Sequence, residues 1–119
     1  MLPPIEHTIK REDDVSFNVL VMAHAPDADK EIHRSAIDTG NYRLFTVVVR
    51  NQEEALEVAR GLAAEEDLDS ILLCPGFTHT DVAELFEALD GQVGVAVARG
   101  DGPSSRISRQ AIEDAYEEH

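Results

Sequence analysis

The chain has 119 residues, the size of one ordinary domain, and its 43% hydrophobic and 29% charged residues are typical of a globular protein. With 24 acidic against 10 basic residues its net charge is −14, which is the wrong sign for binding nucleic acids or anionic membranes. A single cysteine excludes an intramolecular disulfide framework, and the start of the chain shows no secretion signal, so we expect a cytoplasmic protein.

The acidity has two open explanations, adaptation to a salt-rich cytoplasm or the composition of an arginine-biased genome. No apolar run approaches the roughly 20 residues of a membrane helix, so no membrane partner is expected.

The pattern along the chain predicts a loosely ordered arm over residues 1–15 and one domain over residues 16–119. Four runs within the domain are rich in strand-forming residues, at 16–24, 42–50, 70–76 and 92–100. The second run has apolar side chains on both faces, which is typical of strands covered on both sides in a parallel sheet.

Helical patterns follow each of these runs. The first, over residues 27–38, is the weakest, with Ala28, Ile32 and Ala36 on one face and Gly40 as its end. Residues 51–67 open with Asn51 as N-cap and Glu54 as its capping partner. A third helix is predicted from Thr78 to Gly91, with an apolar stripe of Val82, Leu85, Phe86 and Leu89. A fourth is predicted over residues 104–119, with the apolar residues Ile107, Ala111, Ile112, Ala115 and Tyr116.

The order βαβαβαβα predicts a single three-layer α/β domain around a small, mostly parallel four-stranded sheet. A flavodoxin-like strand order is the first expectation and half of a β/α barrel the second. Such a sheet leaves two open edges, so we also expect a homodimer or a higher homo-oligomer.

Polar and reactive side chains follow the ends of these strands. In open α/β sheets ligands bind beyond the carboxyl ends of the strands, so we expect these residues to converge on one rim. Arg50 and Arg99 are candidates to hold an anionic or carbonyl-bearing metabolite, and His24 is a candidate donor or general acid and base.

The stretch "CPGFTH", Cys74 to His79, admits two interpretations. Cys74 and His79 could act as a thiolate–imidazole pair, which makes them, with His24, the catalytic candidates. Alternatively, Cys74 is a small buried residue at a strand end. Gly76 supplies a turn and is, with Phe77, a candidate ligand-binding residue. Phe77 is either a lid over a ligand or a packing residue against the following helix.

Two further interpretations of the sequence involve a bound ion, a metal in one case and a phosphate in the other. His24, His33 and His79 could bind a metal together with Asp27 or Asp81, but the sequence has no closely spaced ligand pair, and no metal site is predicted. The loop "RGDGPSSR" from Arg99 to Arg106 could hold a phosphate with Ser104 and Ser105, or could be an ordinary turn with serine caps.

Four segments resemble a family of small microbial α/β proteins grouped as a domain of unknown function. They are "MAHAPDAD", "EEALEVARGL", "LLCPGF" and "VGVAVAR", and the resemblance covers residues 16–100. It implies that His24, Cys74, Gly76, Phe77 and Arg99 belong to the shared pattern of the family, and it implies no reaction.

The sequence therefore predicts an uncharacterised small α/β protein that binds a small anionic or carbonyl-bearing metabolite at the carboxyl ends of its strands. The alternative is a non-catalytic oligomerising or regulatory domain, and a third possibility is a Cys/His or metal-assisted enzyme. Catalysis and any cofactor stay open.

Overall fold

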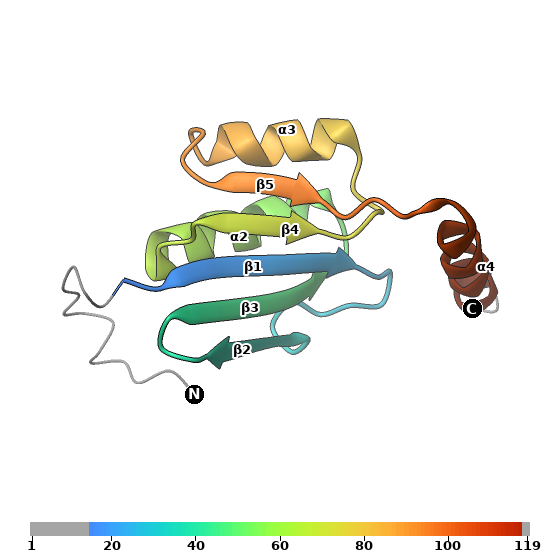
Figure 1. Cartoon of the computed structure of the whole chain (residues 1–119), viewed down its shortest axis with the longest axis horizontal. Coiled ribbons are helices and arrows are strands. Elements are labelled where there is room, and N and C mark those ends of the chain that lie inside the picture. Colours follow the sequence, from blue (N-terminus) through green and yellow to red (C-terminus); the bar gives the residue numbers. More distant parts are fainter. Residues whose placement is uncertain (1–14, 118–119) are drawn as a thin grey trace.

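Five strands form one mixed sheet in the computed structural model, which describes residues 15–117. The sheet order is β2-β3-β1-β4-β5, and β2 is the only one of these strands that runs antiparallel to its neighbour (Figure 1). The strands and helices are, in chain order, β1 (Phe17–His24), β2 (Arg34–Asp38), β3 (Tyr42–Val49), α2 (Gln52–Glu66), β4 (Ser70–Leu73), α3 (His79–Ala88), β5 (Gly94–Val97) and α4 (Gly102–Glu117). The predicted arm of residues 1–15 lies outside the described residues except for Val15.

The helix predicted over residues 27–38 is wrong, because the second half of this segment is the edge strand β2. Ile32, which was expected on a buried helix face, is 69% exposed. The Asp29 carboxylate accepts a hydrogen bond from the Glu31 N–H, and the Asp29 N–H donates to His33 Nδ1, so the segment closes a tight turn instead of a helix. Gly40, with φ of +102°, lies in the β2–β3 turn instead of at a helix end.

The helices predicted after Asn51 and Thr78 are confirmed, since both are encoded by local caps. Asn51 accepts a hydrogen bond from the Glu54 N–H at 2.9 Å at the start of α2. Thr78 and Asp81 form a reciprocal capping box at the start of α3.

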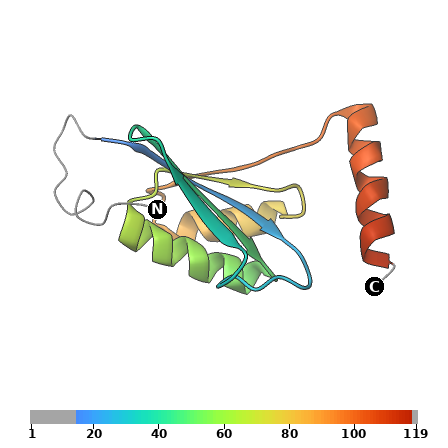
Figure 2. The same cartoon turned by 90° about the horizontal axis from the view of Figure 1, so that it is seen from below.

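The α/β class is confirmed, but the four-stranded, three-layer arrangement is not. The parallel strands follow the order β3-β1-β4-β5, in which the second parallel strand along the chain lies beside the first, as in flavodoxin-like sheets. Both α2 and α3 cover the same face of this sheet (Figure 2). The connection from β1 to β3 contains β2 where a three-layer domain needs a helix, and among residues 15–117 no helix covers the opposite face.

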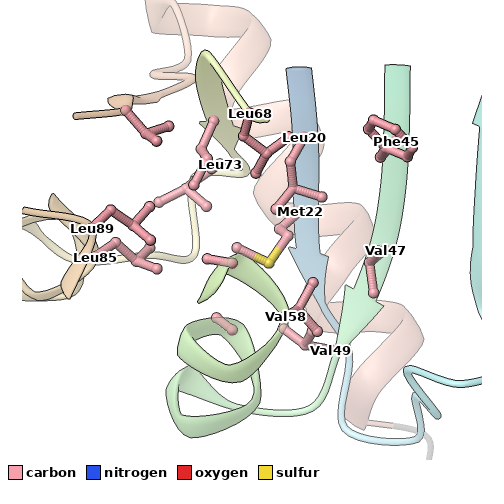
Figure 3. Packing of buried hydrophobic residues seen from close by; sticks show 14 of the residues in the cluster. Leu20, Met22, Phe45, Val47, Val49, Val58, Leu68, Leu73, Leu85 and Leu89 are labelled. Atoms are coloured by element: carbon pink, nitrogen blue, oxygen red, sulfur yellow. The ribbon is translucent and has the colours of Figure 1, made fainter. Parts of the chain in front are cut away.

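The hydrophobic core lies between this sheet and its two helices (Figure 3). Leu20 and Met22 of β1 are fully buried at its centre, and Ala55 and Ala59 of α2 let the helix approach the sheet closely. Leu85 of α3 completes the cluster. Burying a leucine or methionine side chain contributes about 1.5–3 kcal/mol, so this one-sided core accounts for much of the stability of the domain.

Buried polar residues hold the edge of the sheet where the parallel strands begin. The Asn18 side chain donates to the Asp67 carbonyl at 2.9 Å, and the Asn18 N–H donates to the Asp69 carboxylate at 2.9 Å. Arg43, 5% exposed, forms an ion pair with Glu66 and lies over the ring of Phe45. These contacts anchor one end of the sheet and leave the other end for loops.

Candidate functional site

The carboxyl ends of β1, β3, β4 and β5 lie at one edge of the sheet (Figure 1). The chain moves from β1 to β3 on one side and from β4 to β5 on the other, so the strand order reverses between β1 and β4. His24 ends β1, and Cys74 directly follows β4. These two residues flank the position at which α/β sheets bind ligands.

His24 packs against the turn that follows β4. Its ring centroid lies 4.3 Å from that of Phe77, with an angle of 41° between the ring planes. A Cβ atom added to Gly76 would lie 2.7 Å from His24 Cε1, closer than any real contact allows. A side chain at Gly76 would therefore have to displace the imidazole, which lies directly against the glycine backbone.

Phe77 is 1% exposed and belongs to the hydrophobic core. It thus fills the space under the rim, as the packing interpretation of this residue expects.

His79 and Arg99 meet at the neighbouring strand end. His79 is the first residue of α3 and Arg99 follows β5, and Arg99 Nη2 lies 3.5 Å from His79 Nε2. The hydrogen bond from the Ala98 N–H to the Leu73 carbonyl holds the chain beside β4 up to this point. Both side chains are exposed, and among residues 15–117 no carboxylate forms an ion pair with Arg99.

Cys74 is a free, half-buried cysteine whose backbone closes the turn. Its N–H donates to the Met22 carbonyl at 3.0 Å, and its carbonyl accepts from the Phe77 N–H at 3.2 Å. Within the described part of the chain no hydrogen bond joins the Cys74 thiol to His79. The thiolate–imidazole pair therefore stays a prediction, and no hydrogen bond between the two side chains supports it.

Arg50 is bound to a different loop. Its Nε and Nη2 donate to the Ala28 carbonyl at 3.2 and 2.9 Å, and its backbone N–H donates to the Glu54 carboxylate. These contacts tie the loop after β1 to the start of α2. Arg50 therefore has a structural role and is not part of the His79–Arg99 pair.

Ser104 and Ser105 lie in the first turn of α4. Ser105 packs closely against the backbone of Gly100, and its N–H donates to the Asp101 carbonyl at 2.8 Å. Among residues 15–117, neither serine forms a hydrogen bond with His24, Cys74 or His79. Their geometry is that of a helix start.

No group of three or more His, Cys, Asp or Glu residues between positions 15 and 117 is arranged to hold a metal ion. Over the same residues, no helix is long and apolar enough to cross a membrane. The sequence interpretation missed an open groove of about 380 Å³ between α2 and α3, lined by Leu56, Arg60, Glu84, Glu87 and Ala88. No motif marks it, since it forms only when the two helices pack side by side.

The fold and this rim define a class, that of small α/β proteins with one covered sheet face and a polar edge at the strand ends. A family model described as "Family of unknown function (DUF6506)" matches residues 17–113. The chain therefore belongs to this family, which confirms the resemblance to a family of unknown function. The match reaches beyond residue 100 into α4. Comparison with curated proteins and with solved structures found no match.

Proposed function

We propose that this protein binds a small anionic or carbonyl-bearing metabolite at the strand-end rim formed by His24, Gly76, His79 and Arg99. The observation that carries the proposal is the His79–Arg99 pair, next to the point where the strand order reverses. A guanidinium offers a planar fork of donors that matches carboxylate and phosphate oxygens. The imidazole beside it can add one more hydrogen bond.

The aromatic and backbone parts of the rim support the same proposal. His24 is held against Gly76 and Phe77, with the edge of its ring that carries Nδ1, Cε1 and Nε2 next to the Gly76 backbone, so packing fixes the position of the imidazole at the rim. Cys74 begins the turn that carries Gly76 and Phe77, and its backbone is hydrogen-bonded to Met22 and Phe77. The single cysteine of the chain supports a cytoplasmic location for such a metabolite-binding protein.

The first test replaces Arg99 and measures the binding of three probes, inorganic phosphate, oxalate and pyruvate, by titration calorimetry. A hydrogen bond to a charged group contributes about 1.5–3 kcal/mol, so Arg99→Gln is expected to weaken binding of the best probe by about tenfold or more. Arg60→Gln on α2 is the matched control and is expected to bind as the unaltered protein does.

Equal binding by Arg99→Gln and the unaltered protein contradicts the proposal, as does the absence of binding for all three probes. Weakening by both arginine variants points to a general effect of net charge in place of a site. Thermal unfolding of each variant shows whether the substitution has left the fold intact.

The second candidate function is an oligomerising domain without a small-molecule site. The observation that favours it is the placement of α4, which contacts no other helix or strand among residues 15–117. Its test is the oligomeric state of the full chain.

A further inference from the structure

The sheet face opposite α2 and α3 is apolar and uncovered among the described residues. Ile37 pairs with Leu44, Leu44 with Val19, and Val21 with Leu72, so aliphatic side chains form a continuous surface across four strands. Among the large side chains of this face, the exposed fraction is 6% for Val19 near its centre, 40% for Leu72 and 58% for Ile37 on the edge strand. We call this surface the open sheet face; its large members are Phe17, Val19, Val21, Ile37, Tyr42, Leu44, Val48 and Leu72.

Helix α4 is the second unpartnered surface. Its 16 residues have charged side chains on one side and an apolar stripe on the other, formed by Ile107, Ala111, Ile112, Ala115 and Tyr116. Ile107 is 73% exposed and Ile112 is 53% exposed. An isolated helix of this length is only marginally stable in water, so α4 needs a surface on which to bury this stripe.

The two surfaces match in size and kind. At 1.5 Å per residue α4 is about 24 Å long, and β1 and β3, with eight residues each, extend about 26 Å at 3.3 Å per residue. Parallel sheets are ordinarily covered on both faces, and among residues 15–117 only one of the two helical layers is present. The family match also runs into α4 as far as residue 113, so this helix belongs to the family pattern.

The path of the chain directs α4 away from its own sheet. Residues 98–101 leave β5 and carry α4 beyond the edge where the strands end (Figures 1 and 2). Neither Gly100 nor Gly102, which lie on this path, has a positive φ. The close packing of Ser105 on Gly100 holds the corner open.

We propose that α4 of each copy seats its apolar stripe on the open sheet face of a second copy, so that two chains exchange their last helices. Each exchange supplies the helical layer that one chain lacks, and a symmetric pair satisfies both chains at once. The inference does not depend on the proposed ligand site.

The first measurement is the mass of the full chain by sedimentation over a range of protein concentrations. The unaltered chain is expected to form a dimer. Ile107→Glu, which puts a charge into the stripe, is expected to raise the dissociation constant at least about 30-fold, the effect of losing one interface hot spot. Gln110→Glu, on the charged side of α4, adds the same charge and is expected to leave the dimer unchanged.

Cross-linking then separates exchange from folding back. In a Cys74→Ala background, a sample of Ala111→Cys mixed with Thr46→Cys is expected to form a disulfide between the two chains under mild oxidation. Thr46 lies on the open sheet face, since it pairs with Val21 and Ser35. A third sample is a chain that carries both cysteines. If a disulfide forms only within this chain and not between the chains of the mixture, α4 covers its own sheet and the proposal is overturned.

Two other results overturn it as well. One is a chain that stays monomeric at every concentration. The other is a dimer that Ile107→Glu does not weaken, because the two copies then meet through a different surface. The altered helix contacts no other element of its own domain, so these outcomes are not confused with a failure to fold.

Discussion

Gly76 shows how a single position joins the fold to the candidate site. The missing side chain leaves room for the His24 imidazole, which in turn packs on Phe77. A methyl group at this position has to displace the ring, and the ring cannot move without losing its contact with Phe77. The residue therefore ties the turn after β4 to the end of β1.

We expect Gly76→Ala to destabilise the protein by about 1–3 kcal/mol, the usual cost of overpacking, as measured by urea unfolding. Gly61→Ala is the matched control, because Gly61 lies inside α2 with no atom near its missing Cβ. That change is expected to stabilise the protein by about 0.5–1 kcal/mol. Combining Gly76→Ala with His24→Ala relieves the clash, so additive effects of the two changes contradict this account.

At the scale of elements, the helices start where side chains satisfy free backbone N–H groups. Thr78 accepts from the Asp81 N–H at 3.1 Å, and Asp81 accepts from the Thr78 N–H at 2.8 Å. The same capping box orients the first turn of α3, which carries His79 toward Arg99. A local hydrogen-bond pattern thus helps to position a candidate site residue.

Thr78→Ala is expected to lower the free energy of unfolding by about 1 kcal/mol, the typical loss for a removed N-cap. Thr80→Ala, two residues further along the same exposed turn, is the control and is expected to change stability by less than about 0.5 kcal/mol. Chemical denaturation of both variants checks this. Equal losses in the two variants contradict the capping account, since alanine has the higher helix propensity and a loss at Thr80 then has another cause.

At the scale of the whole molecule, the full chain of 119 residues carries a net charge of −14. Like charges repel more strongly in the compact chain than in the unfolded one. Among residues 15–117, Lys30 and Arg43 are the only cations that form ion pairs with carboxylates, and these pairs oppose the repulsion. Repulsion is therefore the larger electrostatic effect.

Raising the ionic strength from about 0.05 M to about 0.5 M shortens the Debye length and screens this repulsion, so the urea midpoint is expected to rise. Potassium chloride is expected to act like sodium chloride, since screening depends on ionic strength and not on the identity of the cation. A midpoint that falls with either salt means that the ion pairs of Lys30 and Arg43 matter more than the repulsion.

The sequence by itself determined the features that depend on neighbouring residues. Asn51 and Thr78 predict α2 and α3, because a cap and its partner lie within four positions of each other. The strand ends that carry His24, Cys74 and Arg99 are also visible in the sequence, because each follows an apolar run. The family membership follows from these same segments.

Only the tertiary structure decided the features that depend on distant contacts. β2 is a strand because residues 34–38 pair with β3, although Ala28, Ile32 and Ala36 of the same segment have the spacing of a helix face. Arg50 binds the Ala28 carbonyl, and His24 packs on Phe77, through contacts that no local pattern encodes. The uncovered sheet face and the detached α4 likewise appear only once the crossovers have placed both other helices on one side.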